Sequence, residues 1–329
     1  MKSPADVAQG IAIVYAPSRL EGLRRRWGTL GQAKFVIQQA QRASELAERS
    51  DAPPVEQVQF EEYEAEATVF NRVLSRLKDD LLALDQPLRL VERSFLSTFD
   101  FRSTQCIVVV GQDGLVANTA KYSLGCPIVA INPDPTRIDG ILLPFSPAQA
   151  VEAVRTTLTG KSRIRQVTLA EARLGDGQRL LAFNDLFIGA RTHISARYRL
   201  QVGGVEELHS SSGVIVSTGA GSTGWLSSVF NQAQGLQQRQ GTEQTITRPE
   251  LRWDSEELCW VAREPFVSRR STADHICGRL KKGEELILES LMPEQGVVFS
   301  DGIEADFLAF NSGTIVRIGV SDERAELVQ

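Results

Sequence analysis

The sequence predicts two domains of different class, an α/β domain followed by a β-rich domain. Three short apolar runs in the first part of the chain, at 11–16, 106–111 and 127–133, alternate with segments whose apolar residues recur at helical spacing. Short strands that are apolar throughout are typical of a parallel sheet covered by helices. From residue 164 onward, strand-like segments separated by glycine-rich turns predict a sandwich-type domain instead.

The N-terminal α/β domain is expected over residues 1–146, with a Rossmann-like parallel sheet. Helices are predicted at 32–49 and 61–84, because each segment places apolar residues on one helical face. A further short strand is predicted at 88–92. The basic stretch 19–31 between the first strand and the first helix has no assigned role.

The β-rich C-terminal domain is expected over residues 147–329. Pro144 and Pro147 mark the boundary, and residues 147–158 predict a connecting helix. Residues 232–256 are rich in Gln, Thr and Arg and predict a loop or an insertion. The strand-like segments are 164–170, 179–189, 197–203, 213–218, 284–290, 296–300, 306–310 and 314–320.

Composition excludes several classes of protein. Of the 329 residues, 42% are hydrophobic and 23% are charged, which is the profile of a globular chain rather than a disordered or fibrous one. The formal net charge of −5 provides no general attraction to nucleic acid or to an anionic membrane. No apolar stretch approaches the roughly 18 residues that cross a bilayer, so neither a nucleic-acid nor a membrane partner is expected, and the cytoplasm is the expected location.

No metal site is expected among the side chains themselves. The four cysteines form no CxxC pair and the three histidines are scattered along the chain, so the spacing of a structural zinc site is missing. We expect the cysteines to be free thiols.

The first segment that bears chemistry is VVVGQDGLVANTAKY at 108–122. A buried strand leads into Gly111, Gln112, Asp113 and Gly114, and then into a predicted helix. Glycines let the backbone approach a phosphate, and a helix N-terminus offers free N–H groups. At the carboxyl end of a parallel strand, Asp113 could accept a hydroxyl proton or help to organise Mg²⁺. The same residues also fit an ordinary turn.

Two further segments leave their local interpretation open. AINPDPTRIDGILLPF at 130–145 runs from a buried strand into a proline-bound loop, which fits either a rigid connection or a binding loop. LLAFNDLFIGA at 180–190 interrupts an apolar strand with Asn184 and Asp185. Burying two polar side chains costs several kcal/mol unless they find partners, and a hydroxyl-rich ligand or a turn would supply them.

The most informative segment is SSSGVIVSTGAGSTGWLSS at 210–228. A strand ends in a cluster of small and hydroxyl residues, and an apolar stretch begins at Trp225. The hydroxyls of Thr218, Ser222 and Thr223 offer hydrogen bonds to ribose or phosphate oxygens. The segment lacks the GK[ST] ending of a Walker loop.

Taken in order, these segments resemble the NAD kinase family. That family has a GGDG loop, then an Asn-Glu pair, then a run similar to DGLIVSTPTGSTAY, and the counterparts here are 111–114, 184–185 and 212–225. The Asp-Pro loop at 132–137 and the tryptophan that ends the run resemble the branch that includes the animal mitochondrial NAD kinases. The resemblance covers about residues 105–320, and two further matches are Arg-Glu-Pro at 263–265 and the Asp301-Gly302 turn.

The resemblance implies an ATP-dependent NAD kinase, a phosphotransferase that acts on the 2′-hydroxyl of the adenosine ribose of NAD to give NADP. It implies that Asp113 is the catalytic carboxylate and that Gly111, Gln112 and Gly114 form the loop beside the ATP phosphates. Mg²⁺ would enter with ATP as the cofactor. The residues implied to bind NAD are Asn184, Asp185, Ser212, Thr218, Ser222, Thr223 and Trp225.

The resemblance also implies partners and assembly. ATP and NAD would be the small-molecule substrates, and the active site would lie in a cleft between the two domains. The C-terminal domain would bind NAD and mediate oligomerisation, as a homodimer or a homotetramer.

Four departures from the family pattern bear on the substrate. Gln112 replaces the second glycine of GGDG, Asp185 is one methylene shorter than Glu, Ser212 replaces an Asp, and Gly219-Ala220 replaces Pro-Thr. Three of these positions touch the expected NAD pocket. One alternative is therefore a kinase of the same fold that acts on another hydroxyl compound, a sugar or a lipid-like diol, and a second is a non-catalytic dinucleotide-binding regulator. The sequence does not choose between NAD and NADH, or between ATP and polyphosphate.

Overall fold

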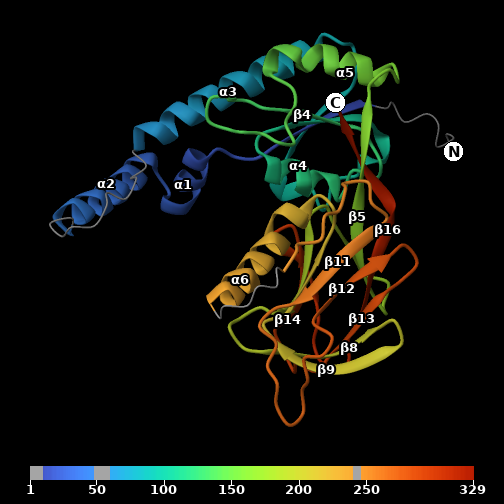
Figure 1. Cartoon of the computed structure of the whole chain (residues 1–329). Coiled ribbons are helices and arrows are strands. Elements are labelled where there is room, and N and C mark those ends of the chain that lie inside the picture. The colour runs from blue at the N-terminus through green and yellow to red at the C-terminus, as the bar shows by residue number, and fades with distance from the viewer. Residues whose placement is uncertain (1–9, 48–59, 240–245) are drawn as a thin grey trace. The chain divides into compact units, whose positions relative to one another are not determined.

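The structure is a computed structural model that describes residues 10–47, 60–239 and 246–329. The described chain forms two compact units. The first comprises the residues up to 115 together with 129–162, and the second comprises 116–128 together with 163–329. An α/β part followed by a β-rich part is what the sequence predicts, and this fold class is confirmed (Figure 1).

The first unit contains a parallel sheet in the order β2-β1-β3-β4. Its strands are β1 (Gly10–Tyr15), β2 (Leu88–Glu92), β3 (Thr104–Val110) and β4 (Ile128–Ile131). β1 pairs in parallel with both β2 and β3. The central runs Ile11–Val14 and Cys106–Val110 are buried throughout, because helices cover a sheet of this kind on both faces. This explains why the strands are apolar without alternation.

The helices of the first unit are α1 (Arg19–Trp27), α2 (Leu30–Ala47), α3 (Phe60–Leu82) and α5 (Ala150–Leu158). α3 buries Phe60, Ala67, Leu77 and Leu81 along one stripe. The predicted helix at 147–158 is present as a short 3-10 turn followed by α5.

The helix α1 occupies part of the basic stretch that the sequence left without a role. It begins after Ser18, whose hydroxyl accepts a hydrogen bond from the backbone N–H of Glu21 at 3.2 Å. It ends at Gly28, which has a φ of 79°. No residue of α1 is fully buried, and its short apolar stripe, Leu20, Leu23 and Trp27, is half-buried.

The second unit is built from two sheets. One contains β16 (Ile315–Val328), β13 (Leu286–Ser290), β8 (Ala196–Val202) and β9 (Val205–Ser211), with β5 (Ile164–Leu174) on β16 and β6 (Arg179–Ala182) on β5. The other is six-stranded and antiparallel, in the order β12-β11-β10-β7-β14-β15. Its strands are β7 (Asp185–Ala190), β10 (Val214–Ser217), β11 (Glu257–Ala262), β12 (Cys277–Lys281), β14 (Gly296–Ser300) and β15 (Ile303–Ala309).

Alternation along β7 shows how the six-stranded sheet is covered on both faces. Leu186 and Ile188 belong to the main core, together with Tyr198, Leu200 and other residues of the first sheet. Phe187, between them, points to the opposite face. There it packs in a second cluster with Leu226 of α6 (Trp225–Arg239). The sheet is therefore a middle layer, with one face available for a site beside α6.

The prediction of a loop at 232–256 is wrong for its first part. Residues 232–239 continue α6, while 240–245 lie outside the described residues and 246–256 contain no regular helix or strand. The glutamine-rich composition of this segment is compatible with a helix because glutamine is a good helix former. None of the described helices is long and apolar enough to cross a membrane.

We expect Gly296→Ala to destabilise the second unit strongly. A Cβ at Gly296, the first residue of β14, would lie 1.8 Å from the carbonyl oxygen of Phe310, so the backbone must move. The expected loss of unfolding free energy is about 3 kcal/mol. Gly235→Ala is the matched control, since a Cβ there meets nothing within 4 Å and an exposed helix gains roughly 0.5–1 kcal/mol from this change. Urea unfolding measures both, and equal effects would contradict the packing described.

Candidate functional site

The Gly111–Gly114 loop lies at the carboxyl end of β3 in the first unit. β3 ends at Val110, and α4 (Asp113–Ala120) begins two residues after Gly111. Gly111 is buried, and a Cβ there would lie 3.0 Å from a Leu115 methyl carbon. Gln112 and Gly114 are exposed, and a Cβ at Gly114 would meet nothing within 4 Å. The loop therefore presents open backbone at the start of a helix, where N–H groups are free for an anion.

The position of this loop in the sheet is the one that ligands favour in open α/β folds. From β1 the chain passes to β2 on one side and then returns to β3 on the other side of β1. The carboxyl ends of β1 and β3 therefore flank a topological switch point. Asp113 follows β3 directly at this point.

The carboxylate of Asp113 accepts two backbone hydrogen bonds. The N–H of Leu142 donates to Oδ1 at 2.8 Å, and the N–H of Ile141 donates to Oδ2 at 3.2 Å. An ionised carboxylate has about four acceptor positions, so these contacts leave room for a ligand. Asp113 is half-buried and thus accessible from one side.

The loop 132–145 that contacts Asp113 is closed on itself. The side chain of Asn132, 5% exposed, donates to the carbonyl of Ile138 at 2.8 Å and accepts from the N–H of Asp134 at 3.1 Å. The N–H of Asn132 donates to the carbonyl of Phe145 at 2.8 Å, which brings the ends of the loop together. The loop is thus a compact element that orients the carboxylate of Asp113, and it is more than a flexible connection.

Two of the predicted NAD-binding motifs meet in the second unit. Asp185 at the start of β7 is paired with Ser217 at the end of β10. The N–H of Thr218 donates to the carbonyl of Asn184 at 2.9 Å, and its hydroxyl donates to the carbonyl of Phe183 at 2.5 Å. The structure therefore joins residues that are more than thirty positions apart in the sequence.

Asp301 fixes this junction, although it is absent from the predicted site residues. Its carboxylate accepts hydrogen bonds from the backbone N–H groups of Phe183, Asn184 and Asp185 at 3.0, 2.6 and 3.2 Å. Burial raises the pKa of Asp301, while the charge of Lys121 and the three N–H groups oppose this rise. The signal available in the sequence was the Asp-Gly pair directly after an apolar strand.

Lys121 is a second residue of this neighbourhood that sequence reasoning missed. Its ammonium group is 1% exposed and lies 2.7 Å from the Ser300 hydroxyl and 3.1 Å from a carboxylate oxygen of Asp306. The hydroxyl of Tyr122 donates to the same carboxylate. A buried lysine is retained only with such partners.

Asp185 carries an oxygen that the protein leaves unsatisfied. Its Oδ1 is buried and has no hydrogen-bond partner within the described part of the chain. Burial raises the pKa of Asp185 to about 7, the Ser217 hydroxyl opposes this, and the negative charge of Asp301 adds to it. A ligand that donates a hydrogen bond to Oδ1 would remove the cost of this buried acceptor.

The glycines of the segment 217–222 are required by close approaches. A Cβ at Gly221 would lie 2.3 Å from the carbonyl oxygen of Asn184, and one at Gly219 would lie 1.9 Å from that of Arg252. The hydroxyl of Ser222 donates to the carbonyl of Gly219 at 2.8 Å. Glycine at 219, where the family has proline, thus fits the local packing of this chain.

The remaining predicted NAD-binding residues, Thr223, Trp225 and Ser212, lie outside the junction between β7 and β10. Thr223 is exposed, and Trp225 is half-buried as the first residue of α6. Ser212 precedes β10, at the end opposite Thr218, and six residues of extended chain span about 20 Å. The structure therefore brings Asn184, Asp185, Thr218 and Ser222 together but not Ser212.

Within the described residues, no group of three or more His, Cys, Asp or Glu side chains is arranged to hold a metal ion. The carboxylates at the junction, Asp185 and Asp301, are a pair without a third ligand.

Comparison with known proteins supports the fold. No family model and no curated protein matches the sequence. Among solved structures, an NAD kinase from Archaeoglobus fulgidus in complex with ATP is similar with a TM-score of 0.54 and 16% identity, over 97% of this chain and 93% of that chain. Yeast NADH kinase complexed with NADH is similar with a TM-score of 0.55 and 12% identity, over 100% and 88%. The chain has the fold of the NAD kinases.

We expect Asp185→Asn to stabilise the protein above neutral pH. The native pKa of about 7 exceeds the ordinary 3.8, so the native state binds more protons than the unfolded chain between these values. The wild-type free energy of unfolding therefore falls as pH rises from about 4 to about 7, and Asn removes this contribution. At pH 8 the expected gain is about 2–4 kcal/mol.

Urea unfolding at pH 5 and pH 8 measures this difference. Asp322→Asn is the control, because that side chain is 94% exposed. Identical pH dependence in Asp185→Asn and the wild type would contradict the raised pKa.

Proposed function

We propose that the protein is an NAD kinase that transfers the γ-phosphoryl group of ATP to the 2′-hydroxyl of the adenosine ribose of NAD. The support comes from three sources: the order of the motifs, the fold shared with kinases solved with ATP and with NADH, and the chemistry of the two loops. The observation that carries the proposal is the buried, unsatisfied Oδ1 of Asp185 beside Asn184.

A ribose supplies what Asp185 lacks. Each ribose hydroxyl is a hydrogen-bond donor that can satisfy a buried carboxylate oxygen. Asn184 offers both a donor and an acceptor next to it. The backbone of both residues is fixed by Asp301, so only the side chain of Asp185, whose Oδ1 is covered by the protein, would have to turn toward the ligand. Thr218, Ser222, Thr223 and Trp225 complete the NAD-binding residues that we propose, and Ser212, at the other end of β10, is included on the resemblance alone.

Asp113 is the proposed general base. It would accept the proton of the 2′-hydroxyl as the 2′-oxygen bonds to the γ-phosphorus and the bond between that phosphorus and the β–γ bridging oxygen breaks, releasing ADP. Its free acceptor positions support this role, because the contacts to Ile141 and Leu142 orient the carboxylate without saturating it. Gln112 and Gly114 would bind phosphate oxygens through their N–H groups, and Gly111, whose N–H donates to the carbonyl of Ile131 at 3.4 Å, would frame the loop.

Mg²⁺ is proposed to enter with ATP rather than to reside in the protein. The described residues offer no cluster of carboxylate and imidazole ligands, and a magnesium ion held mainly by substrate phosphates is common in kinases. When bound, the ion neutralises charge on the transferring phosphoryl group. We further propose a cytoplasmic homodimer or homotetramer, with an N-terminal nucleotide-binding domain to residue 146 and an NAD-binding C-terminal domain. The resemblance supports the assembly and the domain roles, and the sequence pattern supports the location and the boundary.

We expect the purified protein to form NADP or NADPH from Mg-ATP and NAD or NADH. Asp113→Asn should lower kcat by a factor of about 10²–10⁴, because the general base is lost. An NADP-specific dehydrogenase measures the product, and Asp322→Asn, at an exposed site, should retain wild-type activity.

Two outcomes would count against the proposal in different ways. No product from either dinucleotide would overturn the NAD kinase assignment and favour another hydroxyl substrate or a regulator. Full activity in Asp113→Asn, with unchanged thermal unfolding, would overturn only the role of Asp113.

A further inference from the structure

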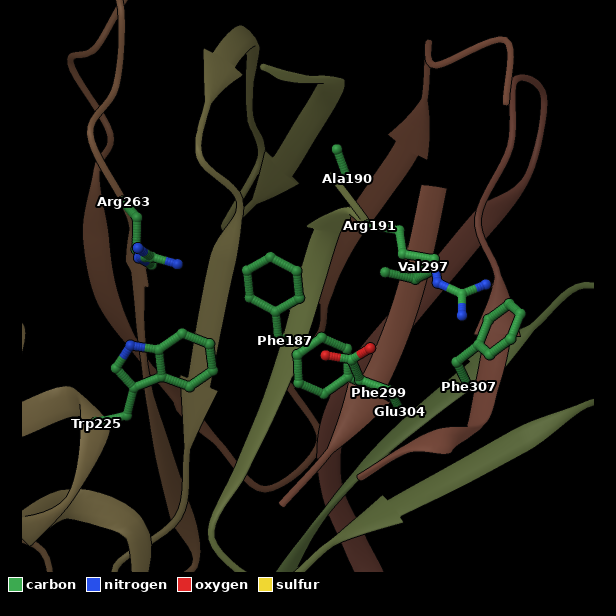
Figure 2. Close-up of a pocket in the computed structure, with 9 residues that line it drawn as sticks. All are labelled: Phe187, Ala190, Arg191, Trp225, Arg263, Val297, Phe299, Glu304 and Phe307. Carbon is green, nitrogen blue, oxygen red and sulfur yellow. The ribbon is translucent and has the colours of Figure 1, made fainter. Parts of the chain in front are cut away.

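A pocket beside α6 in the second unit has a wall of aromatic rings and two arginines. Figure 2 shows Trp225 and Arg263 on one side, Phe187 and Phe299 at the centre, and Arg191 with Phe307 on the other side. The hollow measures about 180 Å³. Most of these residues have no role in the proposed function, and only Trp225 belongs to the residues implied to bind NAD.

The centre of the pocket is an ordered row of rings. The centroids of Phe187 and Phe299 are 4.9 Å apart with an interplanar angle of 30°, and those of Phe187 and Trp225 are 5.6 Å apart at 12°. Phe187 is 6% exposed, so its ring is fixed by the cluster beneath it. A row of nearly parallel rings offers a flat apolar face on which another aromatic ring can stack.

Each arginine is placed against a ring at one side of the pocket. The guanidinium carbon of Arg263 lies 5.3 Å from the centroid of Trp225, and that of Arg191 lies 5.4 Å from the centroid of Phe307. These contacts restrict the guanidinium groups and leave their N–H donors unused.

Neither Arg191 nor Arg263 forms an ion pair in the described part of the chain, although the chain has a net charge of −5. By contrast, several arginines on strands of the second unit pair with a glutamate: Arg173, Arg179, Arg199, Arg279, Arg317 and Arg324. Glu304 is the one carboxylate that lines the pocket. The two guanidinium groups and the one carboxylate together give the lining of the pocket a net positive charge.

The size of the pocket limits what it can hold. Sites for drug-sized ligands usually measure about 300–1,000 Å³, and the hollow of about 180 Å³ is smaller. It fits one ring rather than a whole dinucleotide.

We propose that this pocket binds a single aromatic ring that carries negative charge, and that Arg191 and Arg263 select against a cationic ring. The flat row of rings supplies stacking and the guanidinium groups supply charge-assisted hydrogen bonds to a carboxylate or phosphate on the ring. Trp225 is the one residue that this pocket shares with the proposed NAD-binding site. Its test measures binding alone, so its failure and the failure of the kinase assignment are distinguishable.

Three compounds with the same six-membered ring separate charge from shape. Nicotinate is anionic, nicotinamide is neutral and 1-methylnicotinamide is cationic. We expect nicotinate to bind the full-length protein about tenfold more tightly than nicotinamide, and the cation to bind most weakly, because charge-assisted contacts exceed neutral ones. Isothermal titration calorimetry at one salt concentration gives the three dissociation constants.

Arg191→Met and Arg263→Met assign the selectivity to this pocket. Because nicotinate has one carboxylate and the two guanidinium groups lie on opposite sides of the pocket, one of the two substitutions should weaken nicotinate about tenfold while changing nicotinamide much less, since methionine keeps the apolar stem and removes the charge. Arg279→Met is the matched control, because Arg279 lies on β12 of the same sheet and pairs with Glu257 at 3.2 Å. Thermal unfolding of all variants shows whether they remain folded.

Equal affinity for the three compounds would overturn the proposal, as would an unchanged nicotinate affinity in both pocket variants that remain folded. Loss of nicotinate affinity in Arg279→Met as well would also overturn it, because the effect would then reflect the overall charge of the protein.

Discussion

The candidate site of the second unit depends on one carboxylate. Asp301 accepts three successive backbone N–H groups, those of residues 183–185, and so determines where the chain turns into β7. Through Asn184 and Phe183 this turn also receives the backbone and side chain of Thr218. With both segments fixed, the carboxylate of Asp185 is held in a buried place with one oxygen unsatisfied. A buried carboxylate oxygen without a hydrogen-bond donor destabilises the protein when no ligand is bound. Groups of this kind are typical of binding sites, because a ligand that donates a hydrogen bond removes the cost.

The first unit also contains a carboxylate that accepts hydrogen bonds from backbone N–H groups, in this case two of them. Asp113 accepts the N–H groups of Ile141 and Leu142 and thereby fastens the loop 132–145 to the end of β3. In both places a carboxylate accepts hydrogen bonds from backbone N–H groups, which elsewhere in the fold are satisfied by helices and sheets. The difference lies in the number of donors: three backbone N–H groups of the described chain donate to the carboxylate of Asp301, whereas two donate to that of Asp113, which keeps more acceptor positions free.

The sequence predicted those elements whose burial imposes a recognisable pattern of apolar residues. The apolar runs predicted β1, β3 and β4, and the glycine-rich turns predicted the β-rich part, because both follow from hydrophobic periodicity. α1 was missed because its short apolar stripe lies among four arginines and is only half-buried, and the second half of α6 was taken for a loop because its glutamines form no apolar stripe. Asp301 was noticed only as part of a matching turn. Its partners lie 116 to 118 positions away, and no local pattern encodes a contact at such a separation.

The absence of buried residues in α1 has a consequence for how that helix is attached. Its described links to the rest of the first unit include ion pairs: Arg19 pairs with Glu66 and lies over the ring of Tyr63 in α3, and Arg25 pairs with Glu92 at the end of β2. Such pairs between exposed charges weaken as dissolved ions screen them, over a distance of about 8 Å at physiological ionic strength. α3 and α5, which are attached by apolar faces, lack this sensitivity. A higher salt concentration therefore weakens the polar part of the attachment of α1 and leaves the half-buried side chains of Leu20, Leu23 and Trp27 as the remaining contact.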